Sequence, residues 1–121
     1  MSNDNCPTPP WLMDCFVGWF DPCPLNSDYK TDGLSIDWGD KTYVNPPYSN
    51  PLGWVRKAIE ESKKGKLIVM LLRVDTSTKW FAELVEAGAH FFWASQRIKF
   101  VGKGSPNFAS MLVILNRKGV K

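Results

Sequence analysis

The sequence predicts an α/β protein, folded as a compact three-layer sandwich whose sheet is mostly parallel and ends in a C-terminal antiparallel hairpin. The apolar run 67–72 is uninterrupted and lies between a helical pattern and a turn. Such a run is typical of a strand buried on both faces of a parallel sheet. Helical and strand patterns alternate along the chain, as in α/β folds. The connection 102–107 is too short for a parallel crossover and favours antiparallel pairing.

Length and composition indicate one folded domain over residues 1–121, with residues 1–6 expected to form a disordered tail. The chain is 44% hydrophobic and 22% charged, which is ordinary for a folded domain. Its net charge of +3 is compatible with nucleic acid but does not require it. No run approaches the roughly 18 apolar residues of a membrane span, and no signal-peptide pattern is present.

The three cysteines, Cys6, Cys15 and Cys23, are an odd number and include no close pair suited to zinc. They favour a reducing, cytoplasmic setting without a disulfide framework, and no metal site is expected.

The first predicted helix begins with Thr8 as N-cap and Pro9 at the first helical position, and it ends near Gly18. Trp11, Leu12, Cys15 and Phe16 are expected to share its buried side. Residues 19–21 form a very short candidate strand, which the sequence Pro22-Cys23-Pro24 stops. Residues 25–40 are polar and rich in turn formers.

A strand over 41–44 and a helix after it are the next predicted elements. Asn50 fits the N-cap of this helix, Pro51 its first position, and Gly65 its end. The apolar residues Trp54, Val55, Ala58 and Ile59 recur at helical spacing. The opposite, solvated side is expected to carry Arg56, Lys57, Glu60, Glu61, Lys63 and Lys64.

The remaining elements follow the buried strand 67–72. Residues 75–77 offer N-caps for a helix that ends at Gly88 and whose buried face should comprise Trp80, Phe81, Leu84 and Val85. Residues 90–94 and 98–101 are strand-like, and residues 111–115 form the last strand.

The most informative motif is Asn45-Pro46-Pro47-Tyr48, whose parts can receive a planar exocyclic amine. The Asn45 side-chain oxygen and the Pro46 carbonyl can accept both hydrogens of an amino group, on a backbone stiffened by two prolines. The Tyr48 ring can stack on the heterocycle. An Asn-Pro turn with a packing tyrosine is the alternative. Placement between a strand and a capped helix favours a ligand site, because open α/β sheets bind ligands outside the carboxyl ends of strands.

Several further segments accompany this motif, namely Thr8-Pro9-Pro10-Trp11, Phe20-Asp21-Pro22-Cys23, Asp32-Gly33-Leu34, Asp37-Trp38, Trp80-Phe81 and Arg97-Ile98-Lys99-Phe100. In this order and spacing the chain resembles the phage-type (Dam-like) DNA N6-adenine methyltransferases over roughly residues 7–115. The resemblance implies a reduced methyltransferase fold, S-adenosylmethionine as cofactor, adenine in DNA as substrate, and a phage or prophage gene.

The resemblance also implies roles for individual residues. Asn45, Pro46, Pro47 and Tyr48 would form the catalytic loop. The cofactor would be bound by Thr8, Pro9, Trp11, Asp21, Pro22, Cys23, Asp37 and Trp38. Asp21 could instead initiate a turn, and Trp38 could instead pack in the core. Arg97, Lys99 and Lys103 are candidates for DNA phosphate contacts or for an ordinary solvated face.

The chain departs from the family pattern in two main respects. No glycine-rich loop follows Asp21, and the segment between Asp21 and Asn45 is too short for the two strand–helix units that ordinarily complete the cofactor pocket. Smaller differences are Arg73, where the family tends to a proline, and Gln96, where it tends to a glycine. The missing glycine loop favours one alternative, a non-catalytic nucleic-acid-binding relic. A methyltransferase acting on protein glutamine or an RNA base is a second alternative, because the NPPY motif accepts amides and amines of the same geometry. The DNA recognition sequence, the oligomeric state and a role in restriction, host evasion or regulation are not determined by the sequence.

Overall fold

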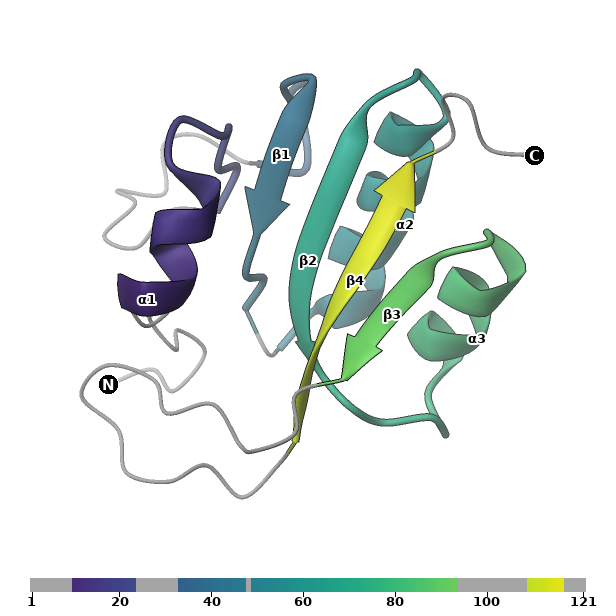
Figure 1. Cartoon of the computed structure of the whole chain (residues 1–121). Helices are drawn as coiled ribbons and strands as arrows, with labels where there is room; N and C mark the ends of the chain where they lie inside the picture. The colour runs from purple at the N-terminus through teal and green to yellow at the C-terminus, as the bar shows by residue number, and fades with distance from the viewer. Residues whose placement is uncertain (1–9, 24–32, 48, 94–108, 117–121) are drawn as a thin grey trace.

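The computed structural model describes residues 10–23, 33–47, 49–93 and 109–116. Its elements are α1 (Pro10–Met13), the 3-10 helix η1 (Asp14–Phe16), β1 (Lys41–Val44), α2 (Pro51–Ser62), β2 (Leu67–Arg73), α3 (Lys79–Glu86), β3 (His90–Trp93) and β4 (Ser110–Asn116) (Figure 1). The α/β class predicted from the sequence is confirmed. The expected tail 1–6, the Thr8 cap, the strand 98–101 and the loop 102–107 lie outside the described residues.

The sheet is mixed, and the prediction that it is mostly parallel is wrong for the described residues. The strand order is β1-β2-β4-β3, in which β1 and β2 pair in parallel while β4 pairs antiparallel with both β2 and β3. The last strand therefore lies between β2 and β3 (Figure 1). Two of the three pairings between the described strands are therefore antiparallel. On the side away from β2, the antiparallel partner of β4 is β3, which begins at His90.

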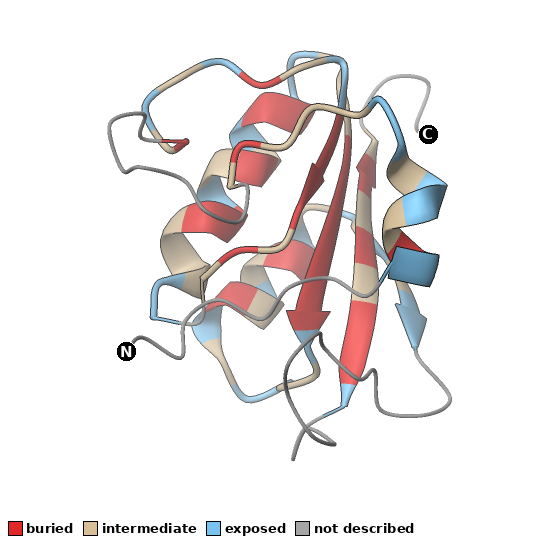
Figure 2. Ribbon diagram, turned by 90° about the vertical axis from the view of Figure 1, so that its left-hand side faces the viewer, coloured by how far each residue is buried: buried red, intermediate tan, exposed pale blue. Residues whose placement is uncertain are grey.

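Side chains of the central strand β2 alternate between two apolar layers, as expected for a strand covered on both faces. Ile68, Met70 and Leu72 belong to the core that α2 and α3 cover. Val69 and Leu71 pack with Leu12 of α1 on the other face. Burial is concentrated in β1, β2 and β4 and in the sheet-facing sides of the helices (Figure 2). The described helices thus lie on both faces of the sheet.

Helix α2 begins and ends where the sequence predicts. The Asn50 side chain accepts a hydrogen bond from the Gly53 backbone N–H at 3.1 Å, Pro51 is the first helical residue, and Gly65 follows the helix with φ of 94°. One predicted surface residue is wrong: Glu61 is fully buried. It follows Trp54 and Ala58 at the i, i+4, i+7 spacing of a single helix face, so it points into the protein with them.

Two expected buried faces are narrower than predicted. Trp11 is 62% exposed and Cys15 is exposed as well, whereas Leu12 is buried. The chain tightens from α1 into η1 after four residues, so the four positions do not follow one α-helical face. In α3, Trp80 and Leu84 are buried at i, i+4 spacing while Val85 is 55% exposed. A residue directly after Leu84 lies about 100° around the helix axis, which turns it away from the sheet.

The start of α3 differs by one residue from the expected caps at 75–77. Thr78 is the N-cap, and its hydroxyl accepts a hydrogen bond from the Phe81 backbone N–H at 3.2 Å. The Asp75 carboxylate instead accepts hydrogen bonds from the backbone N–H and the hydroxyl of Ser77, which forms a turn ahead of the helix. Gly88 adopts φ of 82° after the helix, as expected for its end.

Candidate active site

The loop that begins with Asn45 is held at both of its ends. It leaves the carboxyl end of β1, whose last residue is Val44. The Pro47 carbonyl accepts a hydrogen bond from the Asn50 backbone N–H at 3.4 Å, and the Asn50 side chain caps α2. Asn45 is half-buried and Pro46 is buried. The predicted placement of this motif between a strand and a capped helix is confirmed, while Tyr48 lies outside the described residues.

Asp21 leaves the sheet at the same edge as Asn45. The predicted strand over 19–21 is a single parallel bridge between Phe20 and Thr42. The Phe20 N–H donates to the Lys41 carbonyl, and the Tyr43 N–H donates to the Phe20 carbonyl, both at 2.9 Å. Because neighbouring parallel strands end at one edge, the segment after Phe20 and the loop after Val44 emerge together. The structure thus brings the predicted acidic residue and the predicted amine receptor to one edge.

The carboxylate of Asp21 shapes the turn that follows it. Asp21 Oδ1 accepts a hydrogen bond from the Cys23 backbone N–H at 3.0 Å. Burial raises the pKa of Asp21, and this hydrogen bond partly opposes the rise. Burial, together with the nearby Asp21 charge, raises the pKa of the Cys23 thiol to about 11. Cys23 is therefore a protonated, weakly reactive packing residue at neutral pH.

Asp37 does not lie near Asn45. It precedes β1, at the amino end of that strand, and its side chain is 85% exposed with the Lys64 ammonium 3.3 Å away. Lys64 follows α2, so this contact lies at the sheet edge opposite the Asn45 loop. A role of Asp37 in binding the same ligand as Asn45 would require that ligand to extend along the whole of β1.

Trp38 is enclosed in the core and is 3% exposed. Its ring stacks on Trp54 with a centroid distance of 6.1 Å and an interplanar angle of 27°. Its indole N–H donates to the Gly33 carbonyl at 2.7 Å. These are the contacts expected of a packing residue, which was the alternative to cofactor stacking. We therefore expect Trp38 to act as a packing residue and not to stack on adenosine.

Of the other predicted cofactor residues, the structure describes Trp11, Pro22 and Cys23. Trp11 is exposed on α1, and Pro22 is buried beside Asp21. Thr8 and Pro9 lie outside the described residues. So do the three cations predicted to contact DNA, Arg97, Lys99 and Lys103.

Sequence reasoning gave no role to the close approach of Gly33 to the segment after Asp21. A Cβ atom at position 33 would lie 2.2 Å from the Pro22 carbonyl oxygen and 2.7 Å from the Trp54 ring. Only glycine leaves room for this contact. The glycine thereby positions the turn after Phe20 against the start of α2, and no local pattern in the sequence signals such a contact.

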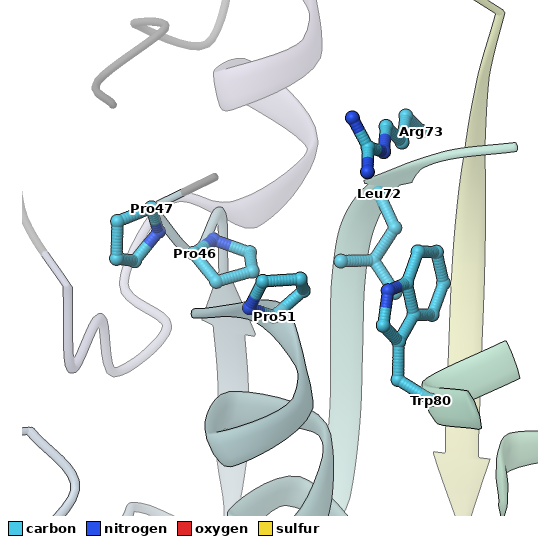
Figure 3. A pocket seen from close by; sticks show the side chains of 6 residues that line it. All are labelled: Pro46, Pro47, Pro51, Leu72, Arg73 and Trp80. Atoms are coloured by element: carbon cyan, nitrogen blue, oxygen red, sulfur yellow. The ribbon is translucent and has the colours of Figure 1, made fainter. Parts of the chain in front are cut away.

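A small apolar pocket lies at the carboxyl ends of β1 and β2, beside the Asn45 loop. Its walls are Pro46 and Pro47 of the loop, Pro51 of α2, Leu72 and Arg73 of β2, and Trp80 of α3. Figure 3 shows the three prolines on one side of the pocket and Leu72, Arg73 and Trp80 on the other. Sequence reasoning missed this pocket. The signal was present, because Arg73 ends the apolar run at the carboxyl end of the strand next to the motif.

Two classes of feature are absent from the part of the chain that the structure describes. It contains no group of three or more His, Cys, Asp or Glu side chains that could hold a metal ion. Within the same residues, no helix is long and apolar enough to cross a membrane.

The fold and the site define an α/β protein with an Asn-Pro-Pro loop and an acidic residue at one edge of its sheet. The sequence model of the DNA N-6-adenine-methyltransferase (Dam) family matches residues 17–118. The chain belongs to this family.

Two curated relatives are both called DNA N-6-adenine-methyltransferase. One, from Haemophilus phage HP1, is 45% identical over 111 residues, which cover 78% of this chain and 64% of the relative. The other, from Escherichia phage T1, is 42% identical over 73 residues, which cover 59% of this chain and 31% of the relative. The chain thus spans less than two thirds of the length of either relative. No solved structure matches.

Proposed function

We propose that this chain transfers the methyl group of S-adenosylmethionine to the N6 amino group of adenine in DNA. The observation that carries the proposal is the Asn45-Pro46-Pro47 loop at the carboxyl end of β1, held by the Asn50 cap. Membership of the family and the names of the two phage relatives support the same reaction.

The chemistry follows from the acceptors that the loop carries. The lone pair of an exocyclic amine is delocalised into the ring, so the amine is a poor nucleophile. Hydrogen bonds from N6 to the Asn45 oxygen and the Pro46 carbonyl would localise this lone pair and orient it. Formation of the bond between N6 and the methyl carbon would accompany cleavage of the carbon–sulfur bond, with S-adenosylhomocysteine as the leaving group, and the proton released from N6 would pass to solvent. The protein's contribution is positioning and electrostatics, without a covalent intermediate.

The substrate base must leave the duplex before this loop can reach N6, because N6 is inaccessible within stacked, paired DNA. Tyr48 would stack on the extruded adenine. Arg97, Lys99 and Lys103 would contribute phosphate contacts, which carry most of the sequence-independent affinity for DNA.

S-adenosylmethionine supplies an electrophilic methyl group on a sulfonium ion. Asp21 fits the methionine end of this cofactor, since it offers a half-buried carboxylate at the edge where the Asn45 loop emerges. A carboxylate there would pair with the ammonium group of the cofactor. Thr8, Pro9, Pro22 and Cys23 would provide neighbouring surface. Asp37 does not converge on this edge in the structure, so we assign it no contact near the reacting atoms.

The deciding experiment is transfer of a tritiated methyl group to DNA by the Asn45→Ala variant. We expect transfer to be abolished, while circular dichroism and the binding of S-adenosylhomocysteine remain as in the parent chain. Asn116→Ala, at the end of β4, removes the same amide at the far end of the sheet and should retain activity. Full activity of the Asn45→Ala variant would refute the assignment.

Two further measurements distinguish the proposed reaction from methylation of protein or RNA and from a non-catalytic relic. Protein glutamine and RNA bases present the same amide or amine geometry, so methyl incorporation should be compared among DNA, RNA and protein fractions. Incorporation into DNA alone is the expected result. A non-catalytic relic is favoured by the absence of a glycine-rich loop after Asp21. Calorimetry with S-adenosylhomocysteine decides this case, since absence of binding would favour the relic.

A further inference from the structure

Arg73 is the charged member of an otherwise apolar pocket. The other five lining residues are three prolines, Leu72 and Trp80. Its side chain is 43% exposed, so the guanidinium reaches solvent at the rim (Figure 3). A cation on the rim of an apolar hollow fits a ligand that combines an anion with an apolar surface, as a nucleotide does.

The position of Arg73 relative to Asn45 follows from the strand register. Val44 pairs with Met70 in the parallel ladder, so Asn45 lies level with Leu71. Arg73 is two residues further along β2, or about 7 Å in the strand direction at the usual rise per residue. The guanidinium therefore projects from the same edge as the loop, on the adjacent strand.

The backbone at Arg73 is firmly held. Arg73 pairs with Ser110 at the end of the β2–β4 ladder, and the Val74 N–H donates to the Ala109 carbonyl at 2.8 Å. The rigid strand end limits the guanidinium to the motion of its own side chain.

The charges around Arg73 leave it able to bind an anion. Its contact with the Asp75 carboxylate, at 3.9 Å, is longer than a hydrogen bond. Both hydrogen bonds from Ser77 fall on Asp75 Oδ1, and the oxygen that faces Arg73 at this longer distance is Oδ2. Helices α2 and α3 both begin beside the pocket, where Pro51 and Trp80 line it. The partial positive charge of two helix N-termini adds to the charge of Arg73.

We propose that Arg73 binds a backbone phosphate of the DNA strand that carries the target adenine, with the sugar of that nucleotide against Leu72 and the prolines. This inference rests on the proposed function, because it takes DNA to be the substrate of the Asn45 loop. Arg73 would act as a positioning residue that fixes the strand beside the loop. The other anion available to this edge, the carboxylate of the cofactor, is a separate outcome of the test.

The test is the salt dependence of binding to a fluorescein-labelled DNA duplex, measured by anisotropy. Each phosphate that a protein neutralises contributes about 0.9 to the slope of log affinity against log salt. Arg73→Ala should lower this slope by about that amount, and Arg73→Lys should retain it because the point charge remains. Lys63→Ala, which removes one positive charge at the opposite end of α2, should leave the slope unchanged.

A kinetic measurement and a binding measurement complete the test. In methyl-transfer assays, Arg73→Ala should raise KM for DNA several-fold with kcat unchanged at saturating DNA, and calorimetry should find unchanged affinity for S-adenosylhomocysteine.

A salt-dependence slope for Arg73→Ala equal to that of Lys63→Ala would overturn the proposal. Weakened S-adenosylhomocysteine binding with an unchanged DNA slope would also overturn it and assign Arg73 to the cofactor. If the parent chain transfers no methyl group to DNA, the proposed function fails, whereas an active parent with an unaltered Arg73→Ala slope refutes this inference alone.

Discussion

The buried carboxylate of Glu61 accepts a hydrogen bond from the backbone N–H of Trp38, 23 residues earlier in the chain, at 3.1 Å. The same carboxylate pairs with the ammonium groups of Lys57 at 3.1 Å, Lys64 at 2.9 Å and Lys66. Lys66 also donates to the Trp38 carbonyl. One carboxylate thereby joins the last turn of α2, the start of β2 and the segment that leads into β1.

The protonation of Glu61 makes stability depend on pH. Burial alone would raise the pKa of Glu61, but hydrogen bonds from Lys66, Lys64, the Trp38 N–H and Lys57 together outweigh it, so the pKa lies well below its usual range. The charged form is therefore favoured by folding. Its contribution is complete above the unfolded-state pKa of about 4.3 and is lost as the pH falls toward the folded-state value.

Glu61→Gln should lower the free energy of unfolding at neutral pH by about 3 kcal/mol, as expected for breaking a buried ion pair of which only Lys64 is well exposed. Urea unfolding at several pH values measures this effect. The stability of the parent chain should fall more steeply between neutral and strongly acidic pH than that of the variant. Parallel pH profiles for the two proteins would contradict the role assigned to Glu61.

Gly33→Ala should destabilise the fold by about 1–3 kcal/mol, the usual cost of overpacking. The added methyl group would meet the Pro22 carbonyl oxygen and the Trp54 ring. Trp54→Phe removes the second contact but not the first, so adding it to Gly33→Ala should give no rescue. Thermal unfolding of the two single variants and the double variant tests this, and rescue would indicate that the ring, not the backbone, is the obstacle.

Trp38→Phe separates packing from cofactor stacking. Loss of the indole N–H leaves the buried Gly33 carbonyl without this partner, so we expect a loss of about 1–3 kcal/mol in stability. The affinity of the folded variant for S-adenosylhomocysteine, measured by calorimetry below its unfolding temperature, should match the parent. A large drop in that affinity with little loss of stability would instead place the ring on the cofactor.

The cysteines Cys15 and Cys23 should differ in reactivity. With a pKa of about 11, Cys23 has roughly one thiolate in a thousand at pH 8, and the thiolate is the reactive form. Cys15 is exposed. Iodoacetamide labelling followed by peptide mass spectrometry should therefore modify Cys15 well before Cys23, and the difference should disappear in denaturant. Equal rates in the folded protein would contradict the burial of Cys23.

Asn50→Ala and Thr78→Ala form a matched pair of helix-cap variants. Each removes one side-chain acceptor from the first turn of a helix, which costs about 1 kcal/mol. Only the Asn50 cap adjoins the loop that begins at Asn45. Alanine would keep the backbone N–H that bonds the Pro47 carbonyl, but fraying of the first turn of α2 would loosen this end of the loop. Asn50→Ala should thus reduce methyl transfer at a temperature where both variants are folded, whereas Thr78→Ala should not. Equal activities would show that the loop keeps its shape without the cap.

Much of the site could be predicted because its signals are local. The β-forming residues before Asn45, the cap at Asn50 and the proline after it define the position of the loop within a few residues of sequence. The i, i+4, i+7 spacing of Trp54, Ala58 and Glu61 also indicates that Glu61 is buried. Reading Glu61 by its charge alone assigned it to the solvent. Lys57 and Lys64 are its partners at helical spacing, but the Trp38 N–H, 23 residues away, reaches it only in the tertiary structure.

The sequence by itself determined the α/β class, the buried strand β2, the capped helix α2 and the edge from which Asn45 emerges, because each depends on periodicity and caps within one element. Tertiary structure alone decided that β4 enters between β2 and β3 and that Gly33 touches Pro22. It also placed Arg73 in the wall of the pocket beside Pro46 and Pro47. These relationships join residues distant in the chain, and they depend on which strands pair and which surfaces pack, for which short-range spacing contains no signal.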